Sequence, residues 1–366
     1  MNSTSLARRP RVHQFLPFFA LPDAVGTHTV RTQEALARAG MDGPIWAERV
    51  LSRGEVEVRH FQGWHPARAS RGQILLYQAS TGSVDGMVEF LAAQPQPKTM
   101  HYHNITPSEF FRAYDEGAAA SMERGRAELQ LLAQTIKLAA ADSEFNASEL
   151  RELGVTNVHV IPPYVPPRLA TEPNSKHLEW LQKTKRGMDL LFVGRVVPNK
   201  GHLNLLRVLA VIRRTIDPHA RLFVVGGWAL PAYTERLFRL RSRLQLEGVV
   251  FTGQVSDAVL AAHYRSADAF ISMSEHEGYG LPLIEAMRFD LPVVAYDAAA
   301  VAETLGGAGV LLRTLDPLLA AEVLARLVQN QDLLSKVRAG QRARLAELDS
   351  LPLDEMQLNF IRQLAG

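Results

Sequence analysis

Residues 274–287 read SEHEGYGLPLIEAM, a pattern typical of a tight turn between a β-strand and an α-helix. The segment before it, residues 269–273 (AFISM), is largely apolar and β-favouring, which predicts a short buried strand. Proline is tolerated in the first turn of a helix and poorly inside one, so Pro282 predicts a helix that begins near Leu281.

This arrangement puts Glu277 on the loop and Glu285 about one turn into the helix. On one continuous helix, eight residues at ~100° each would leave them roughly 80° apart around the axis and ~12 Å apart along it. Because the loop folds back, both carboxylates can instead face the crevice at the carboxyl end of the strand, where open α/β sheets bind ligands. Gly278 and Gly280 would let the backbone approach a ligand, and the helix start favours an anion.

Two glutamates at this spacing carry little information alone, but here two glycines, a proline and an Ala-Met pair are in register with them. The run from Glu277 to Met287 resembles the E-x7-E signature of retaining GT-B glycosyltransferases, the glycosyltransferase 4 family (glycosyl transferases group 1). The resemblance implies an α/β protein of GT-B fold, with two Rossmann-like domains whose parallel sheets face a deep inter-domain cleft. It also implies a nucleotide-diphosphate sugar in the second domain and a hydroxyl acceptor in the first.

The resemblance gives each residue of this stretch a role. Glu285 would accept hydrogen bonds from both ribose hydroxyls, and Glu277 would hold a donor-sugar hydroxyl and the charge that develops near the anomeric carbon. Backbone N–H groups would be offered to phosphate or sugar by Gly278, Tyr279, Gly280 and Leu281. The alternative is an ordinary exposed helix glutamate and an ordinary turn.

Residues 194–201 read GRVVPNKG, between an expected strand and an expected helix. They resemble the family's GR-x-x-x-x-KG segment at Arg195, Lys200 and both glycines. An arginine can grip phosphate oxygens in a bidentate fork and a lysine supplies a point charge, so the pair would compensate a diphosphate. A plain surface turn is the alternative.

Two further glycines border the expected cleft by resemblance. Gly226 follows the second strand of the second half, and Gly26 lies in a turn-rich loop, residues 22–28, before the first helix. Simple turn chemistry is the alternative at Gly26. Residues 253–255 would run beside the base.

His101 and His103 end an expected strand, and alternation puts both on one face, a spacing also seen in metal sites. Without a third ligand in the sequence pattern we expect no metal there. The family often places a histidine of this domain near the reacting sugar, which makes His103 a catalytic candidate beside Glu277, Arg195 and Lys200. A hydrogen-bonded core histidine is the alternative.

Motifs for other chemistry are missing from the sequence. It has no Asp-x-Asp pair, no P-loop and no G-x-G-x-x-G dinucleotide fingerprint. We therefore expect no cofactor and no metal, with the charge of the leaving diphosphate carried by Arg195, Lys200 and helix dipoles.

The 366 residues, 47% of them hydrophobic, are enough for two domains. Strand-like and helical patterns alternate in each half, which predicts parallel βαβ units. Proline-rich residues 162–167 mark a boundary. We expect an acceptor-binding domain over 1–168, a linker over 169–187, a donor-binding domain over 188–347 and a C-terminal helix over 348–366 that crosses back to the first domain.

Charge and hydropathy restrict the partners and the compartment. The net charge of +2 is not concentrated in either half, so nucleic acid is not an expected partner. The absence of cysteine excludes disulfides and thiolate metal sites.

The apolar part near the start is interrupted by Pro17, which favours a strand over a signal peptide. No apolar run approaches ~18 residues, so we expect a cytoplasmic protein, with peripheral contact at the inner face of the membrane as a variant.

The expected activity is retaining, metal-independent transfer from a donor such as GDP-mannose or a UDP-hexose, in glycan, polysaccharide or glycosylated-metabolite synthesis. A nucleotide-sugar 2-epimerase of the same fold is one alternative, and a non-catalytic sugar-nucleotide or glycan-binding protein is the other. The sequence does not specify the nucleotide, the sugar, the acceptor, the linkage or the oligomeric state.

Overall fold

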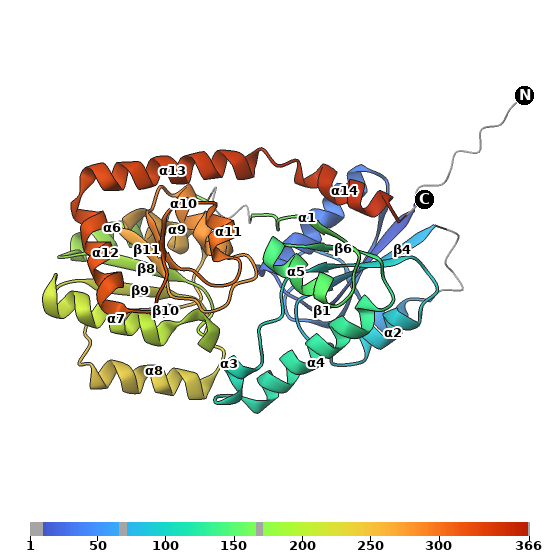
Figure 1. Ribbon diagram of the computed structural model, residues 1–366, viewed down its shortest axis with the longest axis horizontal. Helices are drawn as coiled ribbons and strands as arrows, with labels where there is room; N and C mark the ends of the chain where they lie inside the picture. Colours follow the sequence, from blue (N-terminus) through green and yellow to red (C-terminus); the bar gives the residue numbers. More distant parts are fainter. Residues whose placement is uncertain (1–9, 66–71, 166–170, 365–366) are drawn as a thin grey trace, which may run out of the picture. The chain divides into compact units, whose positions relative to one another are not determined.

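The computed structural model describes residues 10–65, 72–165 and 171–364 (Figure 1). The chain divides into two compact units. The first comprises residues up to Ser108, Gly117–Tyr164 and the stretch from Pro352, and the second comprises Glu109–Glu116 and Val165–Leu351. Each unit is built on one parallel β-sheet.

The first unit holds a seven-stranded sheet in the order β3-β2-β1-β4-β5-β6-β7. Its strands are β1 (Arg11–Phe19), β2 (Asp42–Val50), β3 (Val58–His60), β4 (Gln73–Ala79), β5 (Lys98–Tyr102), β6 (Leu138–Ala141) and β7 (Asn157–Val160). Its helices are α1 (Ala24–Arg38), the short η1 (Phe61–Gly63), α2 (Met87–Ala93), α4 (Glu116–Ala133), α5 (Glu144–Glu152) and α14 (Leu353–Arg362). The order reverses between β1 and β4, and such a switch point is where open parallel sheets bind ligands, at the carboxyl ends of the strands.

Both faces of this sheet are covered. On one face, Phe15, Leu75 and Met100 of the strands belong to a core cluster with residues of α2, α4 and α5. On the other face, Val12 and Ile74 pack in a cluster with α1 and α14. Strands buried on both sides read as nearly continuous apolar runs, as β4 and β6 do.

The second unit holds a six-stranded parallel sheet in the order β10-β9-β8-β11-β12-β13. Its strands are β8 (Asp189–Val193), β9 (Arg221–Val225), β10 (Val249–Gly253), β11 (Ala269–Ser272), β12 (Val293–Tyr296) and β13 (Val310–Leu312). Its helices are α3 (Glu109–Arg112), α6 (Ser175–Thr184), η4 (Pro198–Lys200), α7 (His202–Thr215), α8 (Pro231–Arg243), α9 (Asp257–Ser266), α10 (Leu281–Arg288), α11 (Val301–Leu305), α12 (Pro317–Gln329) and α13 (Gln331–Asp349). Here the order reverses between β8 and β11.

The expected α/β class with two parallel sheets is confirmed, and the local assignments differ in three places. The supposed linker contains α6, which packs against α9; residues 169 and 170 lie outside the described residues. The loop expected over residues 22–28 is shorter, because Asp23 caps a helix that already starts at Ala24. The short edge strand β3 was not predicted.

The C-terminal helix expected over 348–366 corresponds to α14, which spans Leu353–Arg362. Phe360 and Ile361 of α14 are 1% and 0% exposed and lie in the cluster with Val12, Leu36 and Ile74 of the first unit. Among the helices of the described ranges, none combines the length and the apolar character that crossing a bilayer needs.

Truncation of Phe360 should therefore destabilise the first unit. We expect Phe360→Ala to lower its free energy of unfolding by about 3–5 kcal/mol, because the variant loses apolar burial and leaves a cavity. Urea unfolding followed by tryptophan fluorescence measures this, since Trp46 and Trp64 are buried in the first unit. As a control, Leu318→Ala, at a side chain 64% exposed on α12, should change the free energy by no more than about 0.5 kcal/mol. Equal midpoints for the two variants would contradict this account of α14.

Candidate functional site

The loop after β11 turns the chain into α10 at a glycine. Gly280 has a φ of 89°, a left-handed conformation that strains any residue with a side chain. The helix begins at Leu281 with Pro282 in its first turn, as the sequence predicts. The first N–H groups of such a helix have no partner within the helix, so an anion at this end is favoured.

The loop after β8 contacts the loop after β11 through backbone atoms. Gly201 has a φ of 68°, and a Cβ atom at this position would lie 1.8 Å from the carbonyl oxygen of Met273. Asn199 then joins the loops twice: its carbonyl accepts from Glu275 N at 2.8 Å, and its side-chain amide donates to His276 O at 3.1 Å. These contacts fix residues 194–201 beside the glutamate-bearing loop.

Lys200 and Glu277 form an ion pair in this contact. Lys200 Nζ lies 2.6 Å from Glu277 Oε2, and the two side chains are 21% and 13% exposed. The backbone around Glu277 is also held, because its carbonyl accepts from Ala300 N at 3.1 Å. Two of the residues singled out in the sequence therefore share one partly buried site at the switch point of the second sheet.

Glu285 has different surroundings. It is fully buried on α10, and its Oε2 accepts a hydrogen bond of 2.8 Å from the hydroxyl of Tyr264. Tyr264 belongs to α9 and stacks on Phe289, with ring centroids 5.0 Å apart. A glutamate on the core side of an eight-residue helix needs such a donor, because an unpaired buried carboxylate is costly. Its contact with ribose stays a prediction.

Arg195 and Gly226 lie where three strand ends meet. Arg195 directly follows Gly194 after β8, and its side chain is exposed. A Cβ at Gly226 would lie 2.0 Å from Gly194 O, so this position has room for glycine alone. Gly226 N also donates to Gly253 O at 3.0 Å. The loops after β8, β9 and β10 are thus in direct backbone contact. The exposed guanidinium of Arg195 lies beside them.

Of the loop residues 278–281, Tyr279 and Leu281 are 7% and 8% exposed. The hydroxyl of Thr304 donates to the carbonyl oxygen of Tyr279, which holds this turn from the side of α11. In the first unit, Gly26 is buried in the first turn of α1, where a Cβ would lie 2.0 Å from Ala20 O. The proposed ligand contacts of Gly26, Gly226 and residues 278–281 remain predictions.

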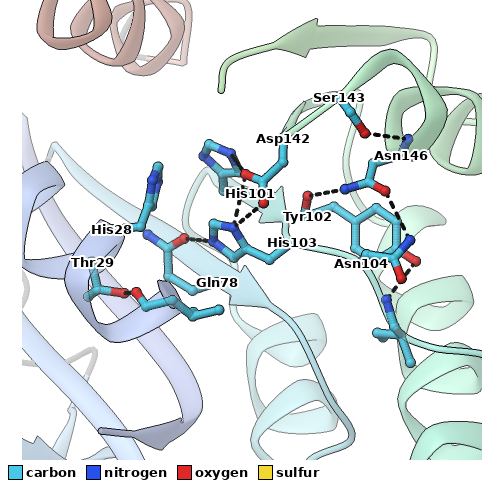
Figure 2. Close-up of polar contacts among 12 residues, drawn as sticks. His28, Thr29, Gln78, His101, Tyr102, His103, Asn104, Asp142, Ser143 and Asn146 are labelled. Atoms are coloured by element: carbon cyan, nitrogen blue, oxygen red, sulfur yellow. Dashed lines mark hydrogen bonds and ion pairs between the residues drawn. The ribbon is translucent and has the colours of Figure 1, made fainter. Parts of the chain in front are cut away.

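His103 lies in a network at the carboxyl ends of β4, β5 and β6 (Figure 2). Its Nδ1 is 3.0 Å from both carboxylate oxygens of Asp142, and His101 Nε2 is 2.9 Å from Asp142 Oδ1. Burial alone would raise the pKa of Asp142, but the charge of His103 and the hydrogen bonds from both imidazoles outweigh it, so this pKa lies well below its usual value. Asp142 thus faces two imidazole rings at once.

His28 of α1 completes a group of three histidines. Its ring stands edge-on to those of His101 and His103, with centroids 4.4 and 4.8 Å away. Burial, followed by the two neighbouring imidazoles, holds the pKa of His28 well below its usual value. In the described part of the chain, these three residues are the group of histidines and acids whose potential metal-ligand atoms come together, within 4.8 Å of one another.

Sequence reasoning missed His28, Asp142 and Gln78 as neighbours of His103. One signal was present: Asp142 directly follows β6 as His103 directly follows β5, and the carboxyl ends of neighbouring parallel strands meet at one edge. Gln78 gave no such signal, because a glutamine inside an apolar strand can be satisfied in many ways. Its partner became visible only in the folded sheet.

Part of the second unit matches a known protein family. Residues 187–330 match the model of the family described as glycosyl transferases group 1. The serotype-specific mannosyltransferase WbdA of Escherichia coli is 38% identical over 112 residues, which cover 30% of this chain and 13% of WbdA. The D-inositol 3-phosphate glycosyltransferase of Jonesia denitrificans is 29% identical over 232 residues, 59% of this chain and 54% of that protein. The chain thus spans at most about half the length of these relatives.

The fold of the whole chain is similar to that of solved proteins. Anabaena Alr3699/HepE, whose crystal structure is in complex with UDP and glucose, superposes with a TM-score of 0.71 over 97% of this chain and 99% of that chain, at 17% identity. At this identity the likeness shows the fold, which is GT-B. The match to glycosyl transferases group 1 thus covers residues 187–330 of the second unit.

Proposed function

We propose that the protein is a glycosyltransferase that moves a sugar from a nucleotide-diphosphate sugar to an acceptor hydroxyl with retention of anomeric configuration. The observation that supports this most directly is the Lys200–Glu277 pair, 2.6 Å apart beside the glycine-led start of α10. Both residues lie inside the segment that matches the family.

The site has the charges that a diphosphate requires. Lys200 is partly exposed, Arg195 is exposed, and the amino end of α10 carries the positive end of the helix dipole. Glycines at 201 and 226 remove the side chains that would hold these loops apart. A developing charge on the leaving phosphate would be stabilised here by groups that are already in position.

We propose that Glu277 acts on the sugar. Its ion pair with Lys200 and the contact of its carbonyl with Ala300 N fix the side chain, so a sugar hydroxyl can donate to a carboxylate of defined orientation. Removal of the acceptor proton would fall to the leaving phosphate, which departs on the same face of the sugar as the acceptor approaches. We propose that no metal and no further cofactor take part.

The donor is proposed from the relatives and the solved neighbour. WbdA is a mannosyltransferase, and HepE is in complex with UDP and glucose, so GDP-mannose and UDP-glucose are the first donors to test. The acceptor would belong to glycan, polysaccharide or glycosylated-metabolite synthesis. The proposed location is the cytoplasm, where nucleotide sugars are available.

A thermal-shift panel of nucleotide sugars tests the proposal. A ligand at one hundred times its Kd adds about 2.7 kcal/mol to the free energy of unfolding, so the true donor should raise the Tm while the free sugar should not. Donor turnover should then require an acceptor. If the donor is epimerised in the absence of an acceptor, the protein is an epimerase and the proposal is wrong. If the donor binds but is never turned over, the protein is a sugar-nucleotide-binding protein.

Removal of the charge of Glu277 should abolish most turnover. We expect Glu277→Gln to lower kcat on the order of 10²–10³-fold, the size found when one group that stabilises developing charge is lost. Steady-state kinetics with the identified donor measure it. Glu275→Gln is the matched control, because Glu275 lies on the same loop but is exposed and faces Asn204. Equal kcat for the two variants would remove Glu277 from the mechanism.

Loss of the Lys200 ammonium should weaken donor binding. A hydrogen bond to a charged group contributes about 1.5–3 kcal/mol, so Lys200→Met should raise the Kd for the nucleotide diphosphate about 10- to 100-fold. Calorimetric titration measures this Kd. The control is Lys185→Met, which breaks another 2.6 Å ion pair of the second unit, with Asp268, away from these loops. The same Kd in both variants would show that Lys200 serves Glu277 alone.

A further inference from the structure

The connection between β5 and α4 is long, and its middle belongs to the second unit. Residues 103–115 separate these two elements, whereas residues 142 and 143 are sufficient between β6 and α5. Loops between a strand and a helix of an α/β sheet usually contain about 2–6 residues, and much longer ones are often functional. The stretch Glu109–Glu116 is part of the second unit, although the residues on both sides of it belong to the first. We call this stretch the 109–116 segment.

The chain enters the 109–116 segment from a fixed point of the first unit. The hydroxyl of Ser108 donates to Glu123 Oε1 of α4 at 3.0 Å. Arg126 Nη2 of the same helix donates to the carbonyl oxygen of Ile105 at 2.7 Å. At its other end the segment runs directly into α4, which begins at Glu116. Both ends of the segment are thus tied to α4.

Within the segment, α3 packs against the loops of the candidate site. It contacts η4, the short helix that ends at Lys200. The ring of Phe110 lies against that of His276, with centroids 6.2 Å apart, which is within the range of favourable aromatic contacts. The side-chain amide of Asn199 donates to the carbonyl oxygen of His276 at 3.1 Å. The residue before Glu277 is therefore held from two sides, through its backbone by Asn199 and through its ring by Phe110.

The end of the segment reaches the loop of Lys200 by another route. The ring of Tyr114 meets that of Tyr233 on α8 edge-on, with centroids 5.0 Å apart. The ring of Tyr233 in turn lies 6.1 Å from that of His202, and both residues are 1% exposed. His202 is the first residue of α7 and follows Lys200 by two positions. A row of rings therefore connects the segment to the start of α7.

These contacts restrain both partners. Helix α3 has four residues, which are too few for a helix that is stable alone in water, so α3 forms because it is docked. The same contacts limit the motion of the loops on which it docks. Such a link is reciprocal: a ligand that fixes residues 274–280 also favours the docked state of the segment.

We propose that Phe110 is a positioning residue of the proposed donor site: it holds His276 in place and thereby the backbone that carries Glu277. The loop of Glu277 is then linked, through the 109–116 segment, to the connection that begins at His103 in the first unit. The effect on binding and turnover rests on the proposed function. The restraint of the loop does not.

Hydrogen exchange of the full chain, followed by mass spectrometry, tests the restraint without any ligand. The amide of Glu275 donates to the carbonyl oxygen of Asn199 at 2.8 Å and reports on the contact between the two loops. In Phe110→Ala we expect residues 274–280 to exchange about 10-fold faster than in the wild type. Strand β8 should exchange as in the wild type, which separates a loosened loop from a lost fold.

Trp180→Ala is the matched control for this experiment. It also removes an aromatic ring at the surface of the second unit, 47% exposed, but Trp180 lies on α6 and its ring contacts His177. Exchange of residues 274–280 should be unchanged in this variant. Unchanged exchange in Phe110→Ala, or equal acceleration in both variants, would overturn the proposal.

The reciprocal effect can be measured in the wild type. UDP or GDP, whichever the protein binds, should slow the exchange of the 109–116 segment at saturating concentration, because a fixed loop 274–280 favours the docked segment. In Phe110→Ala the same nucleotide should slow this exchange much less. Exchange of the segment that does not respond to a bound nucleotide in the wild type would contradict the link.

Steady-state kinetics supply the functional readout. At a temperature at which every variant is folded, Phe110→Ala should lower kcat about 10-fold, because a displaced Glu277 costs turnover. Phe110→Leu keeps an apolar side chain against His276 and should restore most of this loss, while Trp180→Ala should match the wild type. A loosened loop with unchanged kcat would overturn the positioning role. If the wild type turns over no donor, the proposed function fails, while the exchange result still decides whether Phe110 restrains the loop.

Discussion

The close approach of two loops at Gly201 underlies the rest of the site. A glycine with positive φ lets the chain after β8 lie against the carbonyl of Met273, and no other residue type fits there without displacing backbone. Asn199 secures the contact from both sides, and Lys200 then meets Glu277. The Lys200–Glu277 ion pair therefore depends on the close packing of backbone between neighbouring strand ends.

The two glutamates of one motif illustrate how far a sequence pattern reaches. The turn at Gly280 and the helix start at Leu281 follow from local rules for glycine and proline, and both were predicted. The pairing of Lys200 with Glu277 and the burial of Glu285 against Tyr264 depend on residues 77 and 21 positions apart in the chain. Such contacts are set by strand order and helix packing, which local patterns do not encode. Helix α6 was not predicted for the same reason: its sequence is polar, and its packing against α9 is not visible in a local pattern.

The histidine network shows a second limit of prediction from the sequence. His101 and His103 were recognised as neighbours on one strand face, but their chemistry is decided by Asp142, Gln78 and His28, which come from other elements. A histidine is an acid, a base, a ligand or a cation according to what its two nitrogens face. The carbonyls of Thr29 and Gly43, three and four hydrogen bonds away from His103, orient the amides of Gln14 and Gln78. The surroundings of His103 thus depend on residues that it does not contact.

The packing of α14 in the first unit has a consequence for biosynthesis. The chain crosses between the units at residues 108/109, 116/117, 164/165 and 351/352. Phe360 and Ile361, which complete the cluster on one face of the first sheet, are therefore translated after the whole second unit. Until then the nascent sheet exposes Val12, Ile74 and their apolar neighbours. A ribosome-bound intermediate of this chain would offer chaperones an uncovered β-surface for as long as residues 165–351 take to be made.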